Sequence, residues 1–235
     1  MNLKRIIRKS KACYKIFTGG ALPSFSQVGE DMVINYLLRS INIAKPTYLD
    51  IGANHPIHGS NTYFFYHRGF SGICVEPDPN LASLISRVRP RDKVLNVGIG
   101  LDENKSGLLH IFPDPYSGWN TFSKSEAENR ENQSNIKVKE VREIEMIPIN
   151  NVLSNYFEKT PNFLSLDVEG LDEQILKSMD FEKFRPEVVC IETITFSVTN
   201  QEEKLHTIID FMNSKGYKVY ADTHVNTIFS RGDIL

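Results

Sequence analysis

The segment Tyr48-Leu49-Asp50-Ile51-Gly52-Ala53-Asn54 restricts the fold of this chain more than any other stretch. Residues 48–51 form a short, mostly apolar run, which is typical of a strand buried on both faces of a parallel sheet. The small, turn-forming residues that follow favour a tight turn, and a helix-like segment comes next. A strand, a tight turn and a helix in this order open a nucleotide-binding unit of an α/β protein.

The acid at the end of this strand indicates which nucleotide is bound. In dinucleotide sites the first turn carries the pattern G-x-G-x-x-G and presents backbone amides to a pyrophosphate. That pattern is missing here, and the Asp50 carboxylate would repel phosphate groups. S-adenosylmethionine has a sulfonium cation and no phosphate, so the same carboxylate would attract it. The turn therefore favours S-adenosylmethionine over NAD.

Three further apolar runs also end in an acid, and these acids are Glu76, Asp167 and Glu192. Ligands bind beyond the carboxyl ends of parallel strands, so we expect the four acids to share one edge of the sheet. Each acid alone could instead cap a helix. Together they predict an electronegative rim that binds a cation. Glu76 is placed to accept hydrogen bonds from ribose hydroxyls, a role that fits adenosine in either cofactor.

A third strand is predicted over residues 93–100, and its end, with Asn96 and Gly98, is expected to flank an adenine ring. The alternation of strands and helices is then interrupted by an insertion over about residues 106–149, with two antiparallel-type strands and polar loops. This insertion holds Trp119, the only tryptophan. Its ring either contacts a sugar face or closes over the core of its own loop.

The loop after the first strand carries His55 and His58. Two histidines three residues apart suggest a metal site, but no cysteine or second acid cluster lies near them in the sequence. A role in positioning a hydroxyl substrate and a purely structural turn are the other two interpretations.

Composition places limits on the partners. The chain has 235 residues and a formal net charge of -2, which gives no reason to expect a nucleic acid partner. Its three cysteines are expected to be reduced, and no apolar run is long enough to cross a membrane. We therefore expect a cytoplasmic protein.

Two parts of unequal length are expected. Residues 1–25 form a basic amphipathic segment, and residues 26–235 form a single domain. Residues 1–17 either pack on that domain or contact a partner or the inner face of an anionic membrane. The oligomeric state is not predicted by any feature of the sequence.

Three motifs together resemble the FkbM-type S-adenosylmethionine-dependent methyltransferases: D-x-G-A-N at residues 50–54, E-P-x-P at 76–79 and D-x-E-G at 167–170. The resemblance implies a Rossmann-like class I methyltransferase fold. Such a fold has a mainly parallel seven-stranded sheet of order 3-2-1-4-5-7-6, with strand 7 antiparallel and helices on both faces. It also implies O-methylation of a small molecule or glycan, often at a sugar hydroxyl.

The resemblance further implies that Asp50, Gly52, Asn54 and Glu76 hold the cofactor and that Asp167 and Glu169 lie at the methyl-transfer end. We also predict cofactor contacts from the neighbouring residues Ala53, Asn61, Pro77, Asn96, Gly98 and Asp167.

The proton of the acceptor hydroxyl needs a base, and Asp167 is the first candidate, followed by His55 or His58. In a metal-dependent version, Asp167 and Glu192 would hold a divalent cation that acidifies the hydroxyl. Two rival functions remain open. One is an NAD-linked sugar oxidoreductase, and the other is a non-catalytic scaffold with a degenerate methyltransferase fold.

Overall fold

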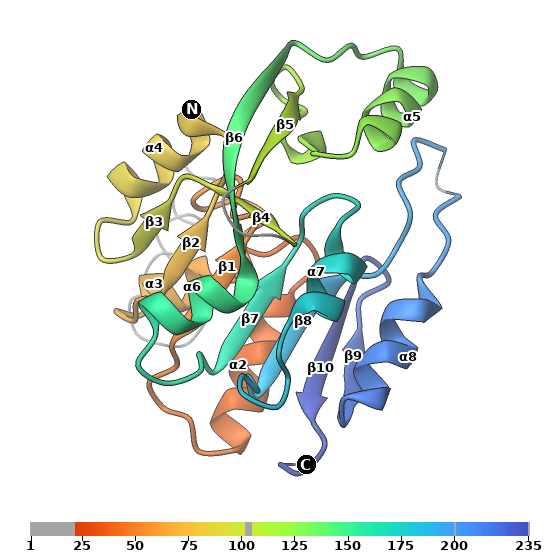
Figure 1. Cartoon of the computed structure of the whole chain (residues 1–235). Helices are drawn as coiled ribbons and strands as arrows, with labels where there is room; N and C mark the ends of the chain where they lie inside the picture. The colour runs from red at the N-terminus through yellow and green to blue at the C-terminus, as the bar shows by residue number, and fades with distance from the viewer. Residues whose placement is uncertain (1–21, 102–104, 200, 235) are drawn as a thin grey trace, which may run out of the picture.

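The computed structural model describes residues 22–101, 105–199 and 201–234 (Figure 1). The basic segment predicted for residues 1–17 lies outside these ranges. Among the described residues, no helix is both long enough and apolar enough to cross a membrane. Cys74 and Cys190 are buried free thiols, and Cys13, the third cysteine, lies outside the described ranges.

The main sheet contains seven strands in the order β3-β2-β1-β7-β8-β10-β9. Neighbours pair in parallel from β3 to β8, and β10 runs antiparallel to both of its neighbours. When only these seven strands are numbered, the order reads 3-2-1-4-5-7-6. The strands are β1 (Tyr48–Ile51), β2 (Ile73–Val75), β3 (Lys93–Leu95), β7 (Phe163–Leu166), β8 (Val188–Glu192), β9 (Tyr217–Asp222) and β10 (Asn226–Arg231).

Helices cover both faces of this sheet, because successive side chains of each buried strand point to opposite faces. On one face, Leu49 and Ile51 pack in a core cluster with side chains of α6 (Ile149–Tyr156), α7 (Asp172–Ser178) and α8 (His206–Ser214). On the other face, Tyr48 packs with side chains of α2 (Glu30–Ser40) and α3 (Tyr63–His67). The predicted α/β class with a mainly parallel sheet is confirmed.

The helix α4 (Pro79–Val88) lies on the same face as α2 and α3, where Ile85 packs against Cys74 of β2. It begins sharply because the Asp78 carboxylate accepts a hydrogen bond from the Asn80 amide at 2.8 Å and Pro79 occupies the first turn. The turn after β2 is thereby fixed at the edge of the sheet where the acids gather.

The interruption in the chain forms a second sheet, of order β4-β6-β5. Its strands are β4 (Gly98–Gly100), β5 (Lys105–Ile111) and β6 (Glu140–Pro148). The single strand predicted over residues 93–100 is wrong, because β3 ends at Leu95 and β4 pairs in parallel with β6 instead. In Figure 1 this part of the chain lies above the carboxyl ends of the parallel strands.

Between β5 and β6 the chain forms a 3-10 turn, η1 (Ser117–Trp119), and the helix α5 (Lys124–Ser134). The sequence predicts polar loops here, and this prediction is wrong for α5. The helix has no apolar stripe, but Ser123 caps it by accepting a hydrogen bond from the Glu126 amide at 3.2 Å. It buries only Ala127 and Arg130.

Candidate active site

A cavity of about 760 Å³ lies between the carboxyl ends of the parallel strands and the insertion. Its size is within the range of small-molecule sites. It is lined by thirteen of the residues predicted from the sequence: Asp50, Gly52, Ala53, Asn54, His55, His58, Asn61, Glu76, Pro77, Gly98, Asp167, Glu169 and Glu192.

Asn96 is the one predicted site residue that does not line this cavity. Its side-chain amide donates hydrogen bonds to the main-chain oxygens of Glu76 and Pro77, each at 2.9 Å. Asn96 therefore fixes the turn after β2, and the expectation that it flanks an adenine ring is not supported.

Gly52 brings two turns of the sheet into contact. Its φ is 79°, and a Cβ atom at this position would lie 1.7 Å from the main-chain oxygen of Asp167. The Gly52 amide donates to the Val75 oxygen at 3.0 Å, and the Asp167 amide donates to the Ile51 oxygen at 3.0 Å. Only glycine combines this backbone conformation with so close an approach. The turn after β1 therefore lies directly against the turn after β7.

The Asp50 carboxylate is held inside the protein rather than presented freely to the cavity. It accepts a hydrogen bond from the Thr62 hydroxyl and lies 3.8 Å from Nη1 of Arg89, whose side chain is fully buried. Arg89 also donates through Nε to Asp92 at 2.7 Å. Burial raises the pKa of Asp50, and the guanidinium of Arg89 works against that rise. Asp50 thus contributes less negative charge to the cavity than the sequence predicted.

Glu76 joins the first two turns. One carboxylate oxygen accepts from the Asn54 amide at 2.7 Å, and the other accepts from the Asp78 amide at 2.8 Å. Burial raises the pKa of Glu76 to about 7. The group is therefore rigidly placed on the cavity wall at the end of β2.

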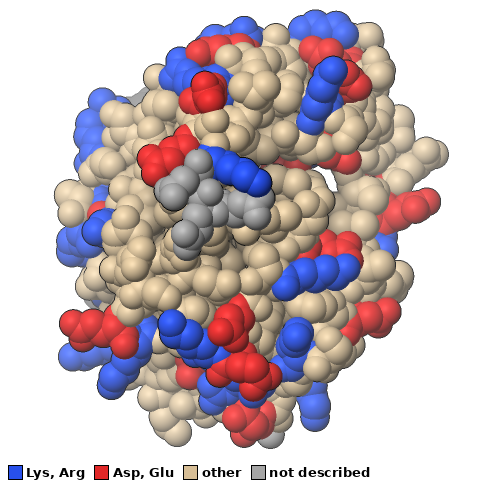
Figure 2. All heavy atoms as spheres, in the orientation of Figure 1, with Lys and Arg blue, Asp and Glu red and all other residues tan. Residues whose placement is uncertain are grey.

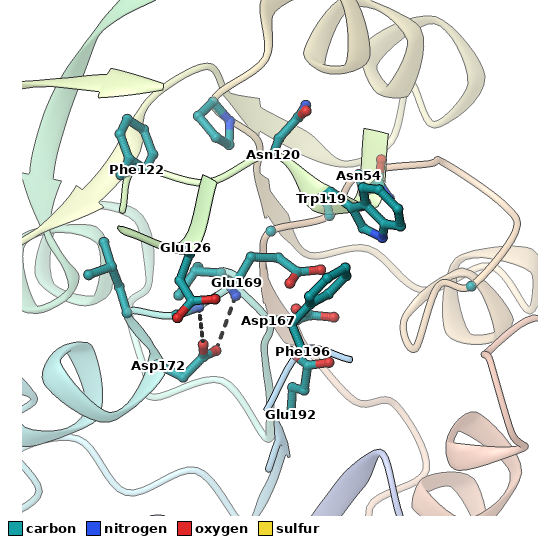
Figure 3. Close-up of a pocket in the computed structure, with 18 of the residues that line it drawn as sticks. Asn54, Trp119, Asn120, Phe122, Glu126, Asp167, Glu169, Asp172, Glu192 and Phe196 are labelled. Carbon is teal, nitrogen blue, oxygen red and sulfur yellow. Dashed lines mark hydrogen bonds between the residues drawn. The ribbon is translucent and has the colours of Figure 1, made fainter. Parts of the chain in front are cut away.

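Three further carboxylates, those of Asp167, Glu169 and Glu192, lie close together on the cavity wall (Figure 3). Oxygens of Asp167, Glu169 and Glu192 all lie within 4.8 Å of one another. Burial is the main cause that raises the pKa of all three, and it brings that of Glu169 to about 7. Repulsion between the carboxylates adds to this effect for Asp167 and Glu192. The cluster will therefore hold either protons or a cation.

The loop that carries these acids is fixed by Asp172, at the start of α7. The Asp172 carboxylate accepts hydrogen bonds from the amides of Val168 at 3.1 Å and Gly170 at 3.3 Å, drawn as dashed lines in Figure 3. Glu169 lies between them with a φ of 58°, a conformation that non-glycine residues rarely adopt. The sequence analysis missed Asp172. The feature of the sequence that could have revealed this role is an acid at the start of a helix, two residues after a glycine in a turn.

The insertion supplies Arg130 and the Trp119 ring, and the segment after β8 supplies the Phe196 ring. The Arg130 side chain is 2% exposed. Its Nη2 atom lies 2.7 Å from a Glu169 oxygen, and Nη1 donates to the Trp119 main-chain oxygen at 2.6 Å. Its guanidinium lies 4.9 Å from the ring centre of Phe196, which in turn lies 5.1 Å from that of Trp119. Arg130 and Phe196 both line the cavity, and the sequence analysis missed both.

The segment before α2, residues 25–27, forms part of the cavity wall. Residue Ser26 forms a parallel bridge with Gly59, and the Ser60 amide donates to the Phe25 oxygen at 3.1 Å. This pairing places Gln27 on the cavity wall, another residue that the sequence analysis missed.

The two predicted histidines lie together, with ring centres 4.8 Å apart. Nδ1 of His55 accepts hydrogen bonds from the amides of Ile57 at 3.1 Å and His58 at 3.0 Å. The neutral ring therefore carries its proton on Nε2 and is suited to donate a hydrogen bond rather than to accept a proton. Burial lowers the pKa of His55, which keeps the ring neutral.

The chain matches one protein family over most of its length. The family model described as "Methyltransferase FkbM domain" matches residues 50–219. The matched range contains the three motifs, the insertion and the acid cluster. No curated protein matches the chain.

Several solved structures have a similar course of the chain at low identity. A TehB-like SAM-dependent methyltransferase from Corynebacterium glutamicum has a TM-score of 0.43 and 10% identity, covering 98% of this chain and 100% of that one. The O-methyltransferase from Bacillus cereus in complex with SAH has a TM-score of 0.44 and 10% identity, covering 93% and 88%. The 1,6-didemethyltoxoflavin-N1-methyltransferase of Burkholderia thailandensis has a TM-score of 0.41 and 8% identity, covering 97% and 87%.

Proposed function

The chain belongs to the FkbM methyltransferase family. From this premise we propose that it transfers a methyl group from S-adenosylmethionine to a hydroxyl group, and we favour the hydroxyl of a sugar as the acceptor. One observation carries the proposal: the Gly52 turn, the Glu76 carboxylate and the acids at the carboxyl ends of β7 and β8 all line one cavity. This arrangement fits an adenosine-containing cation without phosphates.

The residues present fit the cofactor at both ends of the cavity. The Gly52 turn leaves space beside the sheet edge, and Glu76 offers acceptor lone pairs to the ribose hydroxyls. At the other end, burial raises the pKa values of Asp167 and Glu192. A positive charge that binds next to these carboxylates stabilises their ionised forms. Asn54, Ala53, Asn61, Pro77 and Gly98 complete the wall between these ends.

When bound, S-adenosylmethionine supplies a methyl group on a positively charged sulfur that leaves as a neutral thioether, keeping the electron pair of the broken S–C bond. The acceptor oxygen forms the new O–C bond and must lose its proton. The protein mainly holds the acceptor in line and receives that proton, so no covalent intermediate with the chain is required.

Asp167 is the proposed base. Its Oδ1 atom is buried and has no hydrogen-bond partner among the described residues, so it is free to bind the acceptor hydroxyl. The raised pKa of Asp167 also makes it a stronger base than an exposed aspartate once it is ionised. The hydrogen bonds to Nδ1 of His55 favour this assignment over His55, whose proposed role is to donate from Nε2.

Titration calorimetry of the full chain with S-adenosylmethionine, S-adenosylhomocysteine and NAD tests the proposal. We expect binding of the first two and none of NAD. Binding of NAD alone would instead support the function of an oxidoreductase, although the chain lacks the glycine pattern of NAD sites. Binding of none of the three would support the non-catalytic scaffold.

A metal-assisted form of the same reaction is the second candidate, because Asp167, Glu169 and Glu192 offer three carboxylate oxygens within 4.8 Å of one another. Oxygen ligands of this kind suit Mg²⁺ or Ca²⁺. Against it, the guanidinium of Arg130 already occupies Glu169 and adds positive charge beside the cluster. Turnover that is unchanged by a chelator and by added Mg²⁺ would exclude this form.

A further inference from the structure

We propose that Asn61 binds the α-ammonium group of the cofactor and that the buried Arg89 is a positioning residue that holds Asn61 in place. This inference rests on the proposed function, and it assigns one group of the cofactor to one atom of the chain, Oδ1 of Asn61. Asn61 lies in the loop between β1 and α3 and lines the cavity.

The Asn61 side chain has one unused polar atom. Its Nδ2 atom donates to Oγ of Ser165 at 3.1 Å and to Sγ of Cys190 at 3.7 Å. Its Oδ1 atom is buried and has no hydrogen-bond partner among the described residues. Because an unpaired buried acceptor is unfavourable, a ligand that donates a hydrogen bond to Oδ1 is favoured.

The neighbouring strands determine which end of the amide faces the sheet. Ser165 lies opposite Asp50 on the adjacent strand, and its hydroxyl proton is directed to the Asp50 carboxylate. The lone pairs of the Ser165 hydroxyl are then left to accept from Nδ2 of Asn61. The amide nitrogen therefore faces Ser165, and the oxygen is the atom available to a ligand.

Arg89 holds the loop on both sides of Asn61. Nη1 of Arg89 donates to Oγ of Ser60 at 3.4 Å, and Nη2 donates to Oγ1 of Thr62 at 2.9 Å. The Arg89 side chain is itself fully buried, and its Nε atom donates to Asp92 at 2.7 Å. Since the residues before and after Asn61 are bonded to one fixed cation, Asn61 is positioned before a ligand binds.

The place of Asn61 along the sheet matches the amino-acid end of the cofactor. Glu76, the proposed partner of the ribose hydroxyls, follows β2, whereas Ser165 belongs to β7, and β1 lies between these strands (Figure 1). Two strand spacings, about 10 Å, therefore separate the two positions. In the cofactor, the ribose and the α-amino group are joined by a chain of atoms through sulfur that spans such a distance when extended.

Charge favours an ammonium group over a neutral donor at Oδ1. Among the described residues that line the cavity, Arg130 is the only Lys or Arg, and it is paired with Glu169. The acids of the cavity wall therefore attract a cation and not a neutral group. A hydrogen bond from a charged donor is also stronger than one between neutral groups.

Titration calorimetry of the full chain, with no methyl acceptor present, tests the inference with three ligands. S-adenosylhomocysteine carries the α-ammonium group, its deamino analogue has a hydrogen atom in place of that group, and 5′-methylthioadenosine lacks the whole amino-acid end. We expect the unchanged protein to bind S-adenosylhomocysteine about tenfold or more tightly than the deamino analogue, as for a hydrogen bond to a charged group.

Asn61→Leu keeps the size of the side chain but removes Oδ1. It should weaken the binding of S-adenosylhomocysteine about tenfold and leave the affinities of the other two ligands nearly unchanged. Unchanged binding of 5′-methylthioadenosine shows that the fold and the adenosine site are intact. Asn61→Ala, which adds no bulk, should give the same result, whereas Asn61→Asp keeps an acceptor oxygen and should preserve the preference for the ammonium group.

Thr62→Val tests the positioning role of Arg89, because it removes the hydroxyl that accepts from Nη2. It should lower the preference for S-adenosylhomocysteine over the deamino analogue severalfold, with the binding of 5′-methylthioadenosine unchanged. Thr62→Ser keeps the hydroxyl and should restore the preference. Full preference in Thr62→Val would show that Arg89 does not position Asn61.

Asn129→Ala is the matched control for the substitutions of Asn61. Asn129 also lines the cavity, but it belongs to α5 in the insertion. Its truncation should leave the affinities of all three ligands unchanged.

Two results would overturn the inference while leaving the proposed function intact. One is the same preference for S-adenosylhomocysteine over its deamino analogue in Asn61→Leu, in Asn61→Ala and in the unchanged protein. The other is an unchanged protein that binds the deamino analogue as tightly as S-adenosylhomocysteine. If the unchanged protein binds none of the three ligands, the proposed function fails, and this inference fails with it.

Discussion

At the scale of single residues, the closest fit in the site involves Gly52 and the main-chain oxygen of Asp167. We predict that Gly52→Ala destabilises the fold by at least about 2 kcal/mol, because the added methyl group meets backbone that cannot move aside easily. Cofactor binding should be lost with it. Urea unfolding and calorimetry measure these two effects.

Gly69→Ala is the control for this substitution. Gly69 also has a positive φ, of 95°, but a Cβ atom there would have no neighbour within 4 Å. Its cost should therefore be only that of backbone strain, about 1 kcal/mol. Equal losses in the two variants would show that the contact with Asp167 is unimportant.

Asp167→Asn tests the proposed base. The amide keeps the shape of the side chain but cannot take up a proton, so turnover should fall by about 10²–10⁴-fold. S-adenosylhomocysteine binding should change far less, because that ligand is uncharged at sulfur. A variant that retains near-normal turnover with a hydroxyl acceptor would exclude Asp167 as the base.

Residues at strand ends could be predicted from the sequence, and residues that act through distant partners could not. Glu76 and Asp167 each follow a buried apolar run, and this position alone places them at the ligand-binding edge of a parallel sheet. Arg89 and Arg130 gave no such signal, because the site carboxylates that they neutralise, Asp50 and Glu169, each lie 39 residues away in the sequence. The ion pair between Asp50 and the buried Arg89 was missed for the same reason.

At the scale of elements, the buried strands and the two antiparallel strands of the insertion were predictable, and the helix α5 was not. The strands β1, β2, β7 and β8 are fully apolar or nearly so, and each is bounded by turn residues. The helix α5 has the sequence KSEAENRENQS, which shows no apolar periodicity. It is stabilised instead by the Ser123 cap and by Arg130, contacts that periodicity cannot reveal.

The position of α5 over the cavity depends on Arg130. We predict that Arg130→Met destabilises the protein by about 2–3 kcal/mol, because it removes the hydrogen bonds to the half-buried Glu169 carboxylate and to the Trp119 oxygen. Hydrogen exchange of the α5 amides should become faster than that of the main sheet. A helix that keeps its protection in this variant would contradict the assigned role of Arg130.

Arg142→Met provides the comparison within the same insertion. Arg142 pairs with Glu140 at 2.6 Å, but the two side chains are 36% and 39% exposed. Such a pair contributes about 0–1 kcal/mol. The variant should therefore leave both the unfolding midpoint and the exchange of α5 nearly unchanged.

At the scale of the whole molecule, charge is distributed differently outside and inside. Figure 2 shows Lys and Arg interspersed with Asp and Glu on the face in view, in keeping with a formal net charge of -2. The cavity, in contrast, is lined by many acids and by Arg130 as its only Lys or Arg among the described residues. The fold therefore concentrates negative potential where the cofactor is proposed to bind.

This concentration of acids predicts a pH dependence of stability in the absence of ligand. Burial raises the pKa of Glu76 and of Glu169 to about 7, from an ordinary value of 4.5. Between these values the native protein keeps protons that the unfolded chain releases, so the free energy of unfolding should fall as the pH rises through this window, by on the order of 1–3 kcal/mol. The lowered pKa of His55 opposes this trend, but it is one group against several acids. Urea unfolding from about pH 5 to about pH 8 measures the slope.

The same acids predict how ligand binding responds to pH. A cation next to the cluster favours the ionised acids, so S-adenosylmethionine should bind more tightly as the pH rises through about 7 and should release protons on binding. S-adenosylhomocysteine lacks the methyl group and the positive charge on sulfur, so its affinity should change less and fewer protons should be released. Calorimetry in two buffers with different ionisation enthalpies counts these protons for each ligand. Equal proton release by the two ligands would mean that Asp167, Glu169 and Glu192 do not face the sulfur, and the base would then have to be sought elsewhere on the cavity wall.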